Sequence, residues 1–173
     1  GRAAWLGRPV LVLALAAYAI PAVAAMGTEW GYWLIVGWVG WPVVGAVVVL
    51  RSPGNRIGWL MVAMGALFGL SSVGLLLGSQ VPAGVEASVW GLGLVAWTMI
   101  AAIVVLLPNG RPNSRLGTAL LRFLLVLAAL LIVLSSFGVS PLDTSGRTNP
   151  LLVPALQPLA DFVLSDGGFA IVP

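Results

Sequence analysis

The sequence predicts an all-α integral membrane protein with about five transmembrane helices. Of the 173 residues, 60% are hydrophobic and 8% are charged, whereas a soluble domain is about half apolar and about a quarter charged. The mean hydropathy is +1.09, and short polar turns separate long apolar runs. Because so few polar side chains could not cover a soluble surface, we expect the helices to be solvated by lipid.

Five apolar runs are long enough, or nearly so, to cross a hydrocarbon core of about 30 Å. They comprise residues 9–26, 32–50, 57–77, 89–107 and 116–137. The short connections predict that successive helices are antiparallel. The first run also resembles a signal peptide, because Arg2 and Arg8 precede it and small residues follow Pro21. We favour a retained helix because further runs follow, and the remaining topology is the same with either interpretation.

The distribution of charge predicts the orientation. Of the eight basic residues, all except Arg147 lie on one predicted side, namely Arg2, Arg8, Arg51, Arg56, Arg111, Arg115 and Arg122. The five acids lie on the other side, namely Glu29, Glu86, Asp143, Asp161 and Asp166. Arginine near the ends of spanning helices marks the cytoplasmic side. We therefore expect a multi-pass protein of the cytoplasmic membrane, with its N-terminus inside the cell.

Three parts are expected along the chain. Residues 1–138 should form the five-helix transmembrane bundle, and residues 139–168 an extracytoplasmic loop with a short interfacial helix. Prolines and Asp161 interrupt the apolar stretch in this loop, which favours a helix lying along the membrane surface. Residues 169–173 should begin a sixth, truncated transmembrane helix. Because the chain starts with Gly1 rather than Met, we expect it to be part of a longer protein.

The composition excludes several kinds of chemistry. The sequence has no Cys and no His, so thiolate or imidazole metal sites, histidine-ligated haem and thiol nucleophiles are excluded. We predict no catalytic residues, no metal and no cofactor. The calculated pI of about 10.7 comes from dispersed arginines rather than a basic face, so nucleic acid is not an expected partner. No ionisable residue lies near the middle of a run, which argues against ion-coupled transport.

The two predicted inner loops share a motif. Residues 53–58 (PGNRIG) and 112–117 (PNSRLG) both follow the pattern P-x-[N/S]-R-[I/L]-G. The proline disfavours helix in the residue before it, and Asn55 and Ser114 are placed to cap the helices that follow. The neighbouring arginines, namely Arg51, Arg56, Arg111 and Arg115, would engage lipid head groups or a following cytoplasmic domain. The alternative is that both loops simply obey the same rules for starting a helix.

These loops also carry a resemblance to a known family. Residues 51–60 (RSPGNRIGWL) resemble the first inner loop of the N-terminal membrane domains of actinobacterial-type sensor histidine kinases. Residues 106–115 (LLPNGRPNSR) are similar to their second inner loop, and residues 149–151 (NPL) to a segment after their fifth helix. The resemblance implies the input region of a two-component system, with a cognate response regulator contacted through domains outside these residues. No histidine box or ATP-binding segment is present, so it implies no kinase activity for these residues.

Two further groups of residues are candidate contact sites. Gly58, Gly65, Gly69 and Ser72 share one face of the third predicted helix, where small side chains allow close helix contact. That contact is either within the bundle or between two copies in a homodimer. Trp38, Trp41 and Trp97 lie near the middle of their helices. They form either an aromatic cavity for a lipophilic ligand or part of the ordinary packing.

We therefore predict a membrane-embedded sensory region of a sensor histidine kinase, which relays a membrane or extracytoplasmic signal through helix repacking. Its partners would be the lipid bilayer, a second copy of the chain and the response regulator. The alternatives are a small accessory subunit of a membrane complex and a part of a transporter.

Overall fold

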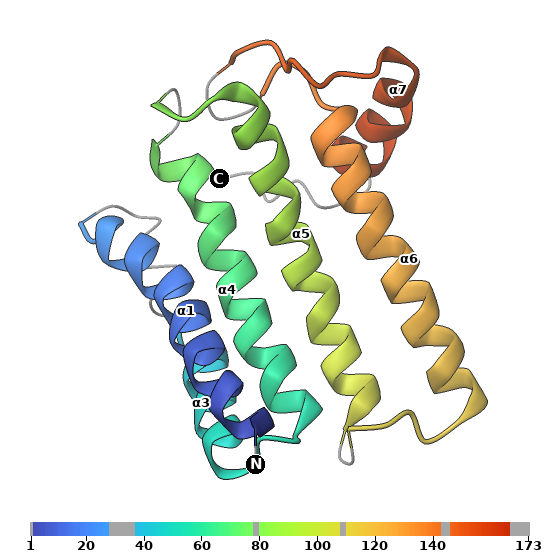
Figure 1. Ribbon diagram of the computed structural model, residues 1–173. Helices are drawn as coiled ribbons and strands as arrows, with labels where there is room; N and C mark the ends of the chain where they lie inside the picture. Colours follow the sequence, from blue (N-terminus) through green and yellow to red (C-terminus); the bar gives the residue numbers. More distant parts are fainter. Residues whose placement is uncertain (1, 28–36, 78–79, 108–109, 143–145, 167–173) are drawn as a thin grey trace.

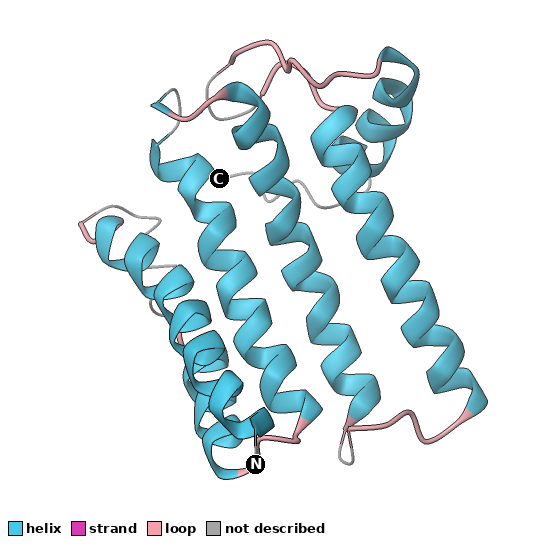
Figure 2. Cartoon of the chain, in the orientation of Figure 1, coloured by secondary structure: helices cyan, strands magenta, loops and turns pink. Residues whose placement is uncertain are grey.

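The computed structural model describes residues 2–27, 37–77, 80–107, 110–142 and 146–166. The regular structure in these ranges is entirely helical, which confirms the predicted all-α class (Figures 1 and 2). The five longer helices are α1 (Arg2–Ala24), α3 (Gly40–Arg51), α4 (Arg56–Leu77), α5 (Ala83–Leu106) and α6 (Arg115–Phe137). Three short segments follow: a 3₁₀-helix η3 (Pro154–Leu156), α7 (Gln157–Ala160) and a π-helix η4 (Asp161–Asp166).

Four of these helices are long and apolar enough to cross a membrane. They are α1, α4, α5 and α6, which supports a multi-pass membrane protein. The 12-residue α3 would extend over only about 18 Å at 1.5 Å per residue. Pro53 disfavours helix at Ser52, where α3 has ended. The first part of the predicted second span, residues 32–36, lies outside the described residues, so a fifth full span stays a prediction.

The start of α5 differs from the sequence prediction. We expected this helix to begin near Val89, with Glu86 in the preceding turn. In the structure α5 begins at Ala83, after Pro82 in the N-cap position, and Glu86 lies in the first helical turn. Proline is compatible with a helix start because it has no N–H to leave unpaired, and a carboxylate in the first turn is favourable in the field of the helix dipole. Glu86 therefore belongs to α5 and not to the turn before it.

The helices form a row rather than a closed bundle (Figure 1). Helix α4 packs against α1 and α3 on one side and against α5 on the other, and α5 in turn packs against α6. The main buried cluster lies where α1, α4 and α5 meet around Trp38, and includes Tyr18, Met64 and Ala96. A second cluster around Val62 joins α4 to α1 and α3. Helix α6 is therefore an edge helix of the row.

Helix α6 is buried mainly in its second half. Its buried residues, Leu131, Leu134, Ser135 and Ser136, all belong to the last two turns. Near its start, by contrast, Leu116 is 78% exposed and Phe123 is 60% exposed. Exposed apolar side chains are expected where a helix faces lipid. The second half of α6 is thus more deeply buried against the rest of the chain than the first half.

The alternating direction of the helices separates the connections into two ends. The N-terminus and the connections after α3 and α5 lie at one end, which we call the arginine end (Figure 1). The connection before α5 and the segment after α6, residues 139–166, lie at the opposite end; we call that segment the outer segment. The helices within the outer segment occupy residues 154–166, and residues 169–173 lie outside the described part of the chain. The cytoplasmic location of the arginine end and the interfacial position of the outer segment stay predictions.

Candidate functional sites

The two loops with the shared motif are capped as predicted. The Oδ1 atom of Asn55 accepts hydrogen bonds from the backbone N–H groups of Ile57 (2.9 Å) and Gly58 (3.2 Å) at the start of α4. The Oγ atom of Ser114 accepts one from the N–H of Gly117 (3.0 Å) at the start of α6. These side chains satisfy donors that the first helical turn leaves without a partner. Both capping predictions are confirmed.

The four candidate arginines of these loops lie at the arginine end and are exposed. Arg51 ends α3, Arg56 begins α4, Arg115 begins α6, and Arg111 lies in the connection between α5 and α6. The fold brings the two loops together beside Arg56. A Cβ added to Gly110 in the second loop would lie 3.9 Å from the Cβ of Arg56 in the first. The loops are therefore adjacent in space although the sequence separates them.

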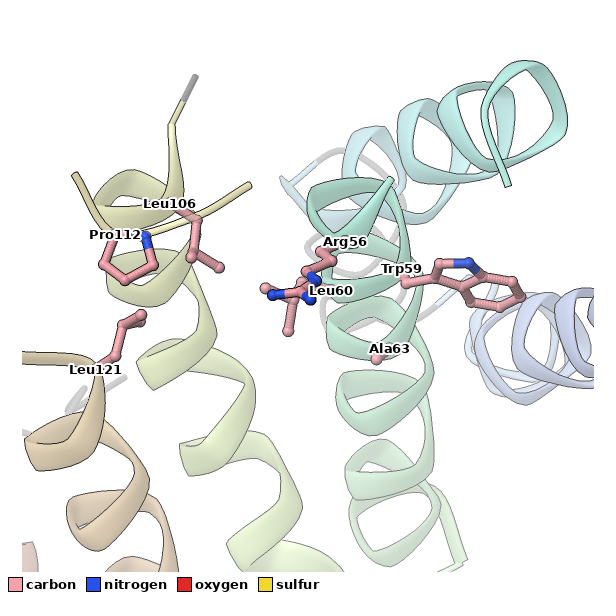
Figure 3. Close-up of a pocket in the computed structure, with 7 residues that line it drawn as sticks. All are labelled: Arg56, Trp59, Leu60, Ala63, Leu106, Pro112 and Leu121. Carbon is pink, nitrogen blue, oxygen red and sulfur yellow. The ribbon is translucent and has the colours of Figure 1, made fainter. Parts of the chain in front are cut away.

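An open groove of about 600 Å³ lies between α4, α5 and α6 at this end (Figure 3). Apart from Arg56, its lining is apolar: Trp59, Leu60, Ala63, Leu106, Pro112 and Leu121. In Figure 3 the Arg56 and Leu60 side chains extend from α4 towards α5 and α6, whereas the ring of Trp59 points towards the other side of α4. That ring donates a hydrogen bond from Nε1 to the carbonyl oxygen of Pro53 (2.9 Å). This groove could not be predicted from the sequence, because its lining comes from three helices and the connection between α5 and α6.

The candidate glycines of α4 face other helices of the same chain. A Cβ at Gly58 would lie 2.8 Å from Cγ1 of Val48, and one at Gly65 would lie 2.6 Å from Cβ of Pro42, both in α3. At Gly69 it would collide with the carbonyl oxygen of Ala17 in α1. The described contacts of these three glycines are thus intramolecular. A homodimer that kept these contacts would have to use other faces.

Ser72, the fourth member of this stripe, is buried and 2% exposed. Its hydroxyl donates a hydrogen bond to the carbonyl oxygen of Phe68 one turn earlier (2.9 Å). The side chain therefore satisfies its polar group within α4, which is the usual solution for serine in an apolar helix. No contact with a second polar side chain is needed to bury it.

The candidate tryptophans pack against neighbouring rings. Trp38 stacks on Phe68 with ring centroids 3.8 Å apart and meets Trp97 edge to face at 4.7 Å. Trp41 is partly buried against the same cluster, while Trp97 is 42% exposed. The stacked distance leaves no room for a ligand between Trp38 and Phe68. Phe68 was not predicted from the sequence, because its position opposite Trp38 depends on how α4 packs.

A partly buried ion pair joins the outer segment to α5. The Arg147 guanidinium lies 2.7 Å from Oε2 of Glu86, and the same Nη2 atom donates to the carbonyl oxygen of Val81 (2.7 Å). The side chain of Glu86 is 4% exposed and that of Arg147 is 34% exposed. Both residues were predicted on the outer side, but their pairing was not predicted. The signal available in the sequence was an acid, Glu86, just before the apolar run that begins at Val89.

Asn149 fastens the same segment to the end of α6. Its Nδ2 atom donates to the carbonyl oxygens of Ser136 (3.0 Å) and Val139 (2.9 Å), and its Oδ1 atom accepts from the N–H of Leu151 (2.9 Å). The residue is 2% exposed. Close packing adds to this attachment, since a Cβ at Gly138 would lie 2.6 Å from Cβ of Ala160. The outer segment is therefore attached to two helices, α5 and α6.

Within the described residues, no three or more acidic side chains lie close enough together to hold a metal ion. Comparison of the chain with protein-family models, curated proteins and solved structures found no significant match.

Proposed function

We propose that this chain is the membrane-embedded input region of a two-component sensor histidine kinase. The observation that carries the proposal is the position of the three segments that resemble this family. Two of them, residues 51–60 and 106–115, lie side by side at the arginine end. The third contains Asn149, which attaches the outer segment to the far end of α6. Helix α6 therefore connects the third segment with residues 106–115, which lie beside residues 51–60.

This arrangement supports a specific route for a signal. A stimulus that displaced the outer segment would act on α5 through Glu86 and on α6 through Asn149. Because the first half of α6 is poorly buried, it can change its position without disrupting the core. The connection between α5 and α6 would then move relative to Arg56 and alter the cytoplasmic surface. Such a movement between two packing arrangements is a common form of switching.

In this proposal the phosphotransfer chemistry belongs to domains outside these residues, and so does the contact with the response regulator. An accessory subunit or a part of a transporter would instead lack any associated kinase activity. The two classes of function can therefore be separated by phosphorylation of the full-length protein.

The test uses the full-length protein in native membrane vesicles supplied with radiolabelled ATP. A sensor kinase should acquire an acid-labile phosphohistidine, and complete absence of such labelling under all stimuli would contradict the proposal. In addition, Arg147→Leu removes the partner of a buried carboxylate and should loosen the outer segment from α5. At equal membrane abundance, it should change the rate of labelling severalfold. Thr148→Leu, at the exposed neighbouring residue, should leave that rate unchanged.

A further inference from the structure

The groove at the arginine end has the position of a lipid site. Arg56 is the first residue of α4, while Leu60 and Ala63 follow it by about 6 and 10 Å along the helix axis. Leu121 lies about 9 Å inside the start of α6. The groove thus begins at the helix ends and continues along the apolar helices. Its volume of about 600 Å³ is within the range of about 300–1,000 Å³ found for small-molecule sites.

The charge around the groove is entirely positive in the described part of the chain. Arg56 lies at its mouth, and Arg51, Arg111 and Arg115 belong to the same end. The acidic side chains that the structure describes are Glu86, in the first turn of α5, and Asp161, in the outer segment, both at the opposite end. No carboxylate of these residues can neutralise Arg56. A guanidinium at a membrane interface binds phosphate oxygens in a bidentate manner.

We infer that this groove binds an anionic phospholipid from the leaflet at the arginine end. The phosphate would contact Arg56, and one acyl chain would lie against Leu60, Ala63 and Leu121. An open apolar groove that faces the bilayer must be filled by hydrocarbon, because water there would leave apolar surface hydrated. The positive charge of Arg56, the charged residue that lines the groove, selects an anionic head group over a zwitterionic one. This inference does not depend on the proposed kinase function.

The bound lipid would also support the edge helix. Its acyl chain would lie against α4, the end of α5 and the first half of α6, in which no described residue is fully buried. Occupation of the groove would therefore hold α6 at a defined distance from α4. The lipid would complete the packing that the protein leaves open.

The experiment is a lipid titration of the purified protein in detergent, followed by native mass spectrometry. Phosphatidylglycerol and phosphatidylcholine serve as the anionic and zwitterionic probes, and Kd is obtained for the first lipid bound. Phosphatidylglycerol should bind about fivefold or more tightly than phosphatidylcholine, as expected for one arginine near lipid phosphate. Arg56→Gln should abolish this preference, whereas Arg56→Lys should keep most of it because the charge remains. Equal affinity of the parent protein for both lipids would overturn the inference.

Two further variants distinguish binding in the groove from non-specific electrostatic attraction between the protein and lipid. Arg122→Gln removes the same charge from an exposed residue of α6 that does not line the groove, so it should leave the Kd of phosphatidylglycerol unchanged. Ala63→Phe fills the groove and should weaken binding of both lipids severalfold. An equal loss with Arg122→Gln and Arg56→Gln would show only unspecific attraction. Circular dichroism checks folding, and the exposed Arg56 variants remain decisive if Ala63→Phe fails to fold.

Discussion

Asn149 illustrates how one buried amide can organise a loop at the end of a helix. The last carbonyl groups of a helix have no partner within it, and in α6 the Asn149 amide donates to Ser136 and also to Val139 just beyond the helix. At the same time its own carbonyl oxygen is satisfied by Leu151. Every polar atom of the side chain therefore has a function in the attachment of the outer segment.

Asn149→Asp should detach the outer segment locally. The aspartate oxygen can still accept from Leu151, but no N–H remains for the two carbonyl groups, which would then face a carboxylate. Leaving buried acceptors unsatisfied costs about 1–3 kcal/mol. Hydrogen exchange of residues 147–153 should accelerate accordingly, while exchange in α4 stays the same. The exposed Thr148→Ala is the control, and equal protection in Asn149→Asp and the parent would contradict this account.

At the level of elements, α4 is the helix that organises the fold. Its glycines permit backbone-close contact with α1 and α3, and α5 covers its other side. In lipid, helices gain little from hydrophobic burial, so close van der Waals contact is a main source of association. The positions of Gly65 and Gly69 should therefore tolerate no added side-chain atom.

Gly65→Ala and Gly69→Ala should each destabilise the protein, because the new methyl group would meet Pro42 or the backbone of Ala17. Overpacking of this kind costs about 1–3 kcal/mol. Gly40→Ala is the matched control, since an added Cβ meets nothing within 4 Å there. The measurement is the free energy of unfolding in mixed detergent micelles titrated with sodium dodecyl sulfate. If all three variants unfolded alike, close packing at α4 would have no energetic importance.

At the scale of the whole molecule, the alternating helices collect the arginines at one end. The described acids and Arg147 gather at the other end, where Glu86 and Arg147 neutralise each other. Among the described residues of the arginine end there is thus no acidic side chain that could neutralise the arginines. By the rule that positive loops stay inside, this end should face the cytoplasm.

Cysteine labelling of intact cells tests this orientation in a chain that has no cysteine of its own. Ser52→Cys and Asn113→Cys place exposed thiols at the arginine end, and Thr148→Cys places one in the outer segment. A membrane-impermeant thiol reagent should label only Thr148→Cys. All three should react after the cells are permeabilised. Labelling of the first two but not the third in intact cells would reverse the topology.

Some features could be predicted residue by residue, because they depend on neighbours in the sequence. The caps by Asn55 and Ser114 require only a polar side chain within three residues of a helix start. Likewise, α4 was expected from residue 57 and begins at Arg56. The start of α5 was predicted wrongly, because the apolar run begins at Val89, whereas the helix begins at Ala83 and includes Glu86, which pairs with Arg147.

The sequence by itself predicted the helical class, the membrane environment, about five spanning helices and the separation of charge between the two ends; four of those helices are long and apolar enough to span in the structure. These properties follow from hydropathy and local chemistry, because each helix satisfies its own backbone in lipid. Only the tertiary structure decided that α6 is an edge helix, that Arg147 reaches Glu86 and that Arg56 borders a groove with Leu121. Lipid-facing and helix-facing positions are equally apolar, so hydropathy cannot distinguish them. Contacts between distant helices depend instead on shape, which small residues such as Gly69 allow but do not specify.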